Sequence, residues 1–320
     1  MQQLFKHVVV PLDQSGMAES ALEPAASLAL AFGATLSLVR VIEPDCVAGE
    51  VQPVDPLQSA LRHAQASAYL TRLGTTLRAR GLQVNEVVSA GDPAQQVVAH
   101  LREREADLLV LSTHGHHDSD VCMPGGHAIQ MLFQAGISVL LIRPPQPGMS
   151  GHQAGPVLVF LDGSARAEHA LPVAAMVAQT GNATLVLAHV LSLPEIPRSV
   201  PLTVDEQRLV GDLIALNRTA MERYLDDAAH QMAGNSEVHT RLLVGRHSVE
   251  ALHNLIAQID ARLVVMSAHG YSGLRRWPYG NVALNLLTYA GVPVLIVQDL
   301  NPLEIGAEVQ LSHGDLPVGH

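Results

Sequence analysis

The sequence is poor in cysteine, in aromatic residues and in charge. Two cysteines in 320 residues exclude a framework of disulfides and favour a reducing compartment. Aromatic residues make up 3% of the chain, so the core must come mainly from aliphatic side chains, and 48% of the residues are hydrophobic. This usage is typical of helices packed on a parallel sheet whose strands are buried on both faces.

Positive charge and long apolar runs are scarce as well. The chain has 19 Lys and Arg against 30 Asp and Glu, a formal net charge of −11, which argues against a nucleic-acid binder with a basic surface. No uninterrupted apolar run is long enough to span a membrane, and the first residues do not have the pattern of a signal peptide. We therefore expect a cytoplasmic protein without membrane or nucleic-acid partners.

The chain contains two copies of one unit. The segment that begins "VVVPLD" at Val8 aligns without a gap with "VLVFLD" at Val157, so that Asp13 falls on Asp162. Later, "ADLLVLSTHG" pairs with "ARLVVMSAHG", and the second copy is six residues longer in between. A segment rich in proline and glycine separates the copies, as expected of a linker. We predict domains over 1–145 and 156–299, a linker over 146–155 and a C-terminal tail over 300–320.

Strand and helix patterns alternate within each copy. In the first copy we expect strands over 7–12, 35–42, 83–91, 107–112 and 138–143. The helical patterns cover 17–32, 56–81, 92–105 and 126–135. Alternation of this kind predicts an α/β fold with two tandem, doubly wound, five-stranded parallel sheets of the Rossmann-like type, each with its first strand near the centre. Asp92 and Pro93 mark the start of a helix as its cap and its first residue.

The residues that could carry a function follow the strands. In open α/β sheets ligands bind beyond the carboxyl ends of the strands, where the positions that end strands one, two and four converge. The candidate binding residues of the first copy are Leu12, Asp13, Val41, Ser112, Gly115 and Gly125. Those of the second copy are Leu161, Asp162, Val190, Ser267, His269, Gly270, Gly280 and Asn281.

The loop from Gly270 to Gly280 leads into a predicted helix at Asn281. Free N–H groups and the dipole at a helix N-terminus favour an anion, and glycine lets the backbone come close to a ligand. Asp162 could accept hydrogen bonds from an adenine or a ribose. The alternative is that the glycines only serve tight turns.

Each copy resembles a universal stress protein domain, and the chain resembles a tandem member of that family. ATP-binding members carry G-x-x-G, nine residues, then glycine followed by Ser or Thr. The second copy has Ser267, Gly270 and Gly280-Asn281 at these positions, and the first has Ser112, Gly115 and Gly125-Gly126. Serine thus replaces the first glycine in both copies. Asn281 keeps a polar side chain where Gly126 has none, so we expect the second copy to bind at least as well.

The resemblance implies an adenine nucleotide as ligand, ATP or else ADP or AMP, with or without Mg²⁺. It also implies a sensor or regulator of the stress response with slow ATP hydrolysis at most, since no phosphate-loop lysine or catalytic motif is present. The alternative from another class is a scaffold with empty crevices that binds a protein partner. An enzyme of the related nucleotide α-hydrolase kind is a third alternative, and the absence of its phosphate-loop signature argues against it.

Two further expectations concern metal binding and assembly. His114, His116, His117 and Cys122 cluster in one loop with ligands that suit zinc, but no paired Cys-x-x-Cys accompanies them, so we predict no metal site. The last strand of each copy is apolar and lies at a sheet edge. The resemblance implies that these two strands pair antiparallel, which makes the chain an intramolecular pseudo-dimer, and a homodimer of chains is a further option.

Overall fold

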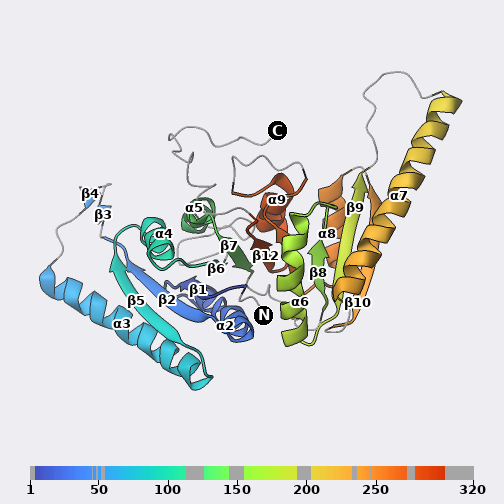
Figure 1. Cartoon of the computed structure of the whole chain (residues 1–320). Coiled ribbons are helices and arrows are strands. Elements are labelled where there is room, and N and C mark those ends of the chain that lie inside the picture. The colour runs from blue at the N-terminus through green and yellow to red at the C-terminus, as the bar shows by residue number, and fades with distance from the viewer. Residues whose placement is uncertain are drawn as a thin grey trace.

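The computed structural model describes residues 4–44, 46–47, 50–51, 55–112, 126–143, 155–192, 203–232, 236–245, 247–271 and 278–299. It is an α/β protein in which helices cover both faces of a central sheet (Figure 1). The predicted linker lies outside the described residues except for Gly155, so the exact domain limits stay predictions. No helix in these ranges is long and apolar enough to cross a membrane.

One continuous sheet of ten strands runs through the molecule, in the order β10-β9-β8-β11-β12-β7-β6-β1-β2-β5. The strands of the first half are β1 (His7–Pro11), β2 (Thr35–Ile42), β5 (Val84–Ala90), β6 (Leu108–Ser112) and β7 (Ser138–Ile142). Those of the second half are β8 (Val157–Phe160), β9 (Leu185–Ser192), β10 (Val238–Gly245), β11 (Leu263–Ser267) and β12 (Val294–Val297). All pairs within a half are parallel, and β1 and β8 are the central strands, as predicted.

The last strands of the two halves pair antiparallel, which confirms the expected join. Leu295 of β12 lies opposite Leu140 of β7. The guanidinium of Arg143, just after β7, donates hydrogen bonds to the carbonyls of Leu287 and Thr288 at 2.9 and 2.7 Å. Each half therefore covers the edge that the other would leave exposed.

Eight long helices and several short segments pack on the sheet in the described residues. On one face lie α2 (Leu22–Phe32), α3 (Pro56–Ala79), α6 (Ala170–Thr180) and α7 (Val204–Met232). On the other lie α4 (Pro93–Glu103), α5 (Gly126–Ala135), α8 (Ser248–Gln258) and α9 (Asn281–Tyr289). Asp92 caps α4 as predicted, because its carboxylate accepts the N–H of Gln95 at 2.9 Å.

The sequence prediction differs from the structure in two places. The single helix expected over 17–32 is divided into α1 (Gly16–Glu19) and α2. Pro24 lies in the first turn of α2. Because proline has no N–H, it cannot donate a helical hydrogen bond to the carbonyl of Ser20, and the helix is interrupted there. A short hairpin, β3 (Cys46–Val47) and β4 (Glu50–Val51), was not expected.

Candidate functional site

A cavity of about 540 Å³ lies at the carboxyl edge of the second half. The ends of β8, β9 and β11 form its floor, and the start of α9 closes one side. Seven of the predicted binding residues line it, namely Asp162, Val190, Ser267, His269, Gly270, Gly280 and Asn281. The structure therefore brings together segments more than a hundred residues apart, at the place where parallel sheets bind ligands.

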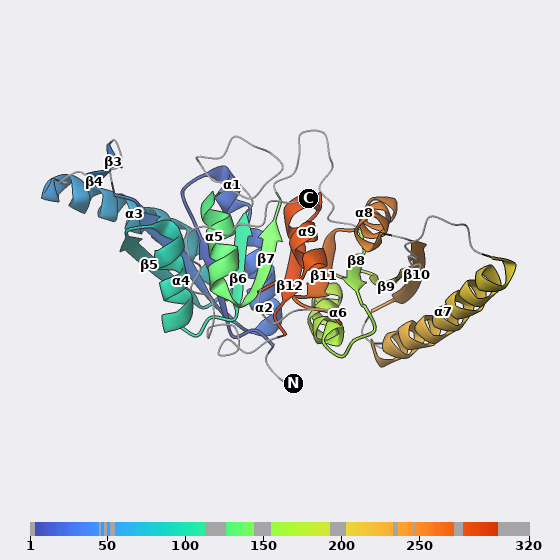
Figure 2. The ribbon, with the colours of Figure 1, turned by 90° about the horizontal axis from the view of Figure 1, so that it is seen from above.

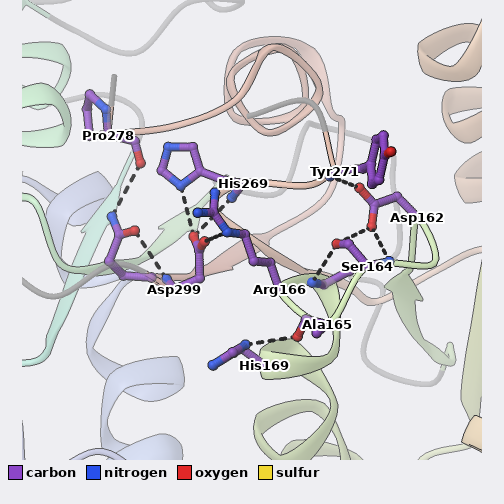
Figure 3. Close-up of polar contacts among 11 residues, drawn as sticks. Asp162, Ser164, Ala165, Arg166, His169, His269, Tyr271, Pro278 and Asp299 are labelled. Atoms are coloured by element: carbon purple, nitrogen blue, oxygen red, sulfur yellow. Dashed lines mark hydrogen bonds and ion pairs between the residues drawn. The ribbon is translucent and has the colours of Figure 1, made fainter. Parts of the chain in front are cut away.

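Asp162 ties the glycine loop to the end of β8. Its Oδ1 accepts the N–H and the hydroxyl of Ser164 at 3.0 and 2.6 Å, and its Oδ2 accepts the N–H of Tyr271 at 2.5 Å (Figure 3). A Cβ on Gly270 would lie far inside van der Waals distance of that Oδ2. Only glycine allows this close approach without a clash, so Gly270 has a structural role in the loop.

The equivalent aspartate of the first copy shapes the same turn. Asp13 accepts the N–H and the hydroxyl of Ser15 at 2.9 and 2.6 Å, and the hydroxyl accepts the N–H of Ala18 at 3.0 Å. The hydrogen bonds repeat those that Asp162 makes with Ser164. Both aspartates thus have a structural role in the turn after the first strand, and a contact with a base or ribose stays a prediction.

Gly280 and α9 form the other side of the cavity. The N–H of Gly280 donates to the carbonyl of Ala268 at 2.7 Å, which fixes the start of the helix above the end of β11. No side chain of the described residues caps α9, and its first intrahelical bond runs from Leu284 N–H to the Gly280 carbonyl. The N–H groups of the first turn are thus left for an anion, where the helix dipole also favours negative charge.

Two serines occupy the position of the motif's first glycine. Ser267 is only 3% exposed, and its Oγ has no hydrogen-bond partner among the described residues. The Oγ of Ser112, its counterpart at the end of β6, is buried without a partner in the same way. A buried hydroxyl left unpaired costs about 1–3 kcal/mol. A ligand that formed a hydrogen bond with the Oγ of Ser267 from the adjoining cavity would remove that cost.

His189 adds a polar group that the sequence analysis missed. Its Nδ1 lies 2.8 Å from the carbonyl oxygen of Leu161, which can only accept, so Nδ1 carries the hydrogen. In the neutral ring, Nε2 is then an acceptor. Two hydroxyls at the same end of the cavity, of Ser192 and Ser248, lie 3.2 Å apart. In the sequence, the only signal for these polar residues is their position: His189 and Ser192 lie toward the carboxyl end of β9, and Ser248 begins α8.

A buried charge network holds His269. The carboxylate of Asp299 is fully buried, and its Oδ1 lies 2.8 Å from Nδ1 of His269 and accepts the backbone N–H of the same residue at 3.2 Å. The Nε of Arg166 lies 3.7 Å from Oδ2 (Figure 3). The sequence alignment places Met17 and Pro144 at the equivalents of Arg166 and Asp299. The network therefore distinguishes the second copy from the first.

Apolar side chains form the remaining wall. Phe160, Met266 and Tyr279 line the cavity, and all three belong to the buried core. The hydroxyl of Tyr279 donates to the carbonyl of Leu132 in the other half at 3.1 Å, and burial raises its pKa. Burial also raises the pKa of Tyr224, with a further contribution from the nearby carboxylate of Glu168. An apolar wall beside polar groups suits an aromatic ring.

Several predicted residues lie elsewhere. Leu161 is in the core and reaches the site only through its carbonyl, and Leu12 and Val41 are buried in the first half. Gly115 and Gly125 lie outside the described residues, as does the cluster of His114, His116, His117 and Cys122. Within the described ranges, no three His, Cys, Asp or Glu side chains are grouped as metal ligands.

The architecture defines a tandem α/β protein with a cavity at the carboxyl edge of its sheet, and comparison with known proteins identifies its class. The model of the universal stress protein family matches residues 4–143 and 154–298. The chain belongs to the universal stress protein family. It is a tandem member, because the model matches twice.

Relatives of similar length support the same assignment. A universal stress protein of Mycolicibacterium smegmatis is 25% identical over 299 residues, which cover 91% of this chain and 96% of the relative. One of Mycobacterium tuberculosis is 24% identical over 300 residues with the same coverage. The crystal structure of a universal stress protein from Archaeoglobus fulgidus covers 94% of this chain and 100% of that one, with a TM-score of 0.66 and 16% identity, a likeness of fold.

Proposed function

We propose that the chain is a regulatory protein of the stress response that binds an adenine nucleotide in the crevice of its second half. The observation that carries this proposal is the buried Oγ of Ser267, which has no hydrogen-bond partner among the described residues and lies beside a cavity that the start of α9 also lines. A polar group buried without a partner is uncommon in proteins, and a bound ligand is one of its ordinary explanations.

The polar groups of the cavity suit the parts of a nucleotide. The N–H groups at the start of α9 would hold phosphate oxygens. Because Nδ1 of His189 faces the carbonyl of Leu161, its Nε2 can serve as the acceptor, which suits the amino group of adenine. Phe160 and Met266 supply the apolar surface for a base. ATP, ADP and AMP share these features, and the proposal covers all three.

The role proposed is binding and not turnover. Efficient phosphoryl transfer in phosphate-loop enzymes uses a lysine on the phosphates, and neither glycine loop has that lysine, although the second contains Arg275 and Arg276. The histidine of the loop, His269, already bonds Asp299 through its Nδ1, which fits a fixed structural part of the loop. We place such a regulator in the cytoplasm. An empty scaffold that binds a protein partner is the competing function, supported by the three hydrogen bonds that Asp162 already receives.

Isothermal titration with ATP would separate these functions. We expect the wild type to bind, and Gly280→Val to lose binding at the second crevice, because the branched side chain would occupy the phosphate position. The fold should tolerate the change, since a Cβ on Gly280 would lie 3.4 Å from the Ala268 carbonyl, an ordinary contact. Gly291→Val, at an exposed glycine where a Cβ meets nothing within 4 Å, is the matched control.

If Gly125→Val lost ATP binding while Gly280→Val bound ATP like the wild type, the nucleotide site would be in the first copy and not the second. No heat of binding in the wild type at any ATP concentration tested would favour the scaffold.

A further inference from the structure

Helix α7 carries an apolar stripe that its own domain does not cover. Leu209, Leu213 and Leu216 are 71%, 47% and 68% exposed. They follow one another at intervals of four and three residues, which places them on one face of the helix. In both views α7 lies at the outer end of the molecule (Figures 1 and 2), and only Leu225 and Ala228, nearer its C-terminus, are buried.

The full spacing of this stripe occurs only in the second copy. In the sequence alignment Ala60-Leu61 of α3 matches Ala215-Leu216 of α7, so α7 begins about two turns earlier than α3. The counterparts of Leu213, Ala220 and Arg223 on α3 are Gln58, Gln65 and Ala68. The exposed leucines of α3 are Leu61 and, one turn earlier, Leu57, which aligns with Asp212 and not with a residue of the stripe. The longer helix and its leucines therefore do not follow from the common fold.

The stripe continues into charged residues at both ends. Glu206 precedes Leu209 by three residues, and Arg223 follows Ala220 by three. The six residues then alternate at intervals of three and four, which is the spacing of the contact face of a two-helix coiled coil, and we call this face the seam: Glu206, Leu209, Leu213, Leu216, Ala220 and Arg223. Thr203 donates from its N–H and its hydroxyl to the carboxylate of Glu206, both at 2.8 Å, and so fixes that end of the seam. Ala220 and Arg223 are exposed.

We propose that α7 pairs antiparallel with α7 of a second copy of this chain. With the two-fold axis between residues 214 and 215, Leu213 meets the partner's Leu216, and Leu209 meets the partner's Ala220. The same register places Glu206 opposite the partner's Arg223 at both ends of the seam. A parallel pair would set Glu206 against Glu206 and Arg223 against Arg223, so the charges select the antiparallel arrangement. The occupant is a second copy because the seam is complementary to itself.

Sedimentation velocity of the full chain over a range of concentrations tests this pairing. The wild type is expected to be a dimer at high concentration. Leu213→Glu should make it a monomer, because it brings two carboxylates into the apolar centre. Leu61→Glu on α3, at the position equivalent to Leu216 and also exposed, should leave the dimer unchanged. Circular dichroism would show that both variants keep the fold.

A charge exchange tests the register. Arg223→Glu alone should weaken the dimer about tenfold or more, because it sets like charges opposite each other at both ends. The double variant Glu206→Arg with Arg223→Glu should restore it. A wild type that is monomeric at every concentration, a dimer that survives Leu213→Glu, or a double variant no better than Arg223→Glu would each overturn the proposal.

Discussion

Replacing Gly270 with alanine is expected to destabilise the second domain by about 1–3 kcal/mol, because the new methyl group and the carboxylate of Asp162 cannot occupy the same space. The carboxylate would have to turn away and give up the N–H of Tyr271, so the glycine loop would lose its tie to β8. Nucleotide binding should fall with it. Urea denaturation followed by circular dichroism measures the free energy of unfolding.

A double-mutant cycle shows whether the loss comes from this contact. In Asp162→Ala combined with Gly270→Ala the collision is absent, so the double variant should cost clearly less than the sum of the two single changes. Gly291→Ala, at a position open to solvent, should change the free energy of unfolding by less than about 0.5 kcal/mol. A Gly270→Ala protein as stable as the wild type would show that the loop is not held as described.

The second large effect is expected at Asp299. Removing one partner of a buried ionic network leaves the other charged or polar groups without compensation, which costs about 3–5 kcal/mol. Asp299→Ala would remove the acceptor for the ring and the backbone N–H of His269 and leave Arg166 without its ion pair. Thermal unfolding followed by calorimetry should show the transition of the second domain at a markedly lower temperature.

Two variants control for the position and the charge. Asp299→Asn keeps an oxygen that can accept from His269, so it should recover part of the lost stability. Asp227→Ala removes a carboxylate from an exposed position on α7 and should have little effect. If Asp299→Ala unfolds like Asp227→Ala, the network contributes nothing to the stability of the site.

Much of the fold could be predicted because its signals are local. Apolar runs of strand length and helical spacing mark the elements, and the internal repeat fixes their order twice. The pairing of β7 with β12 was predicted from the resemblance to a family and from the apolar edge strands. The divided helix at Ser20 was missed, although Pro24 was the signal for it.

The site could be predicted only in part, because its contacts are not local. The sequence placed Asp162 and Gly270 at one edge of the sheet, but the hydrogen bond from Tyr271 depends on how two loops meet. Asp299 was not predicted at all. It follows the last strand, thirty residues after His269, and nothing in the local pattern links the two. The unpaired hydroxyl of Ser267 is likewise visible only once the strands are assembled.

The most direct test of a nucleotide-binding function is mass spectrometry of the small molecules released when protein purified under native conditions is denatured. We predict that the wild type releases at least about one molecule of ATP, ADP or AMP per chain. Gly280→Val, purified in parallel, should release clearly less. A wild type that releases no adenine nucleotide, even after incubation with excess ATP and removal of the unbound fraction, would contradict the account.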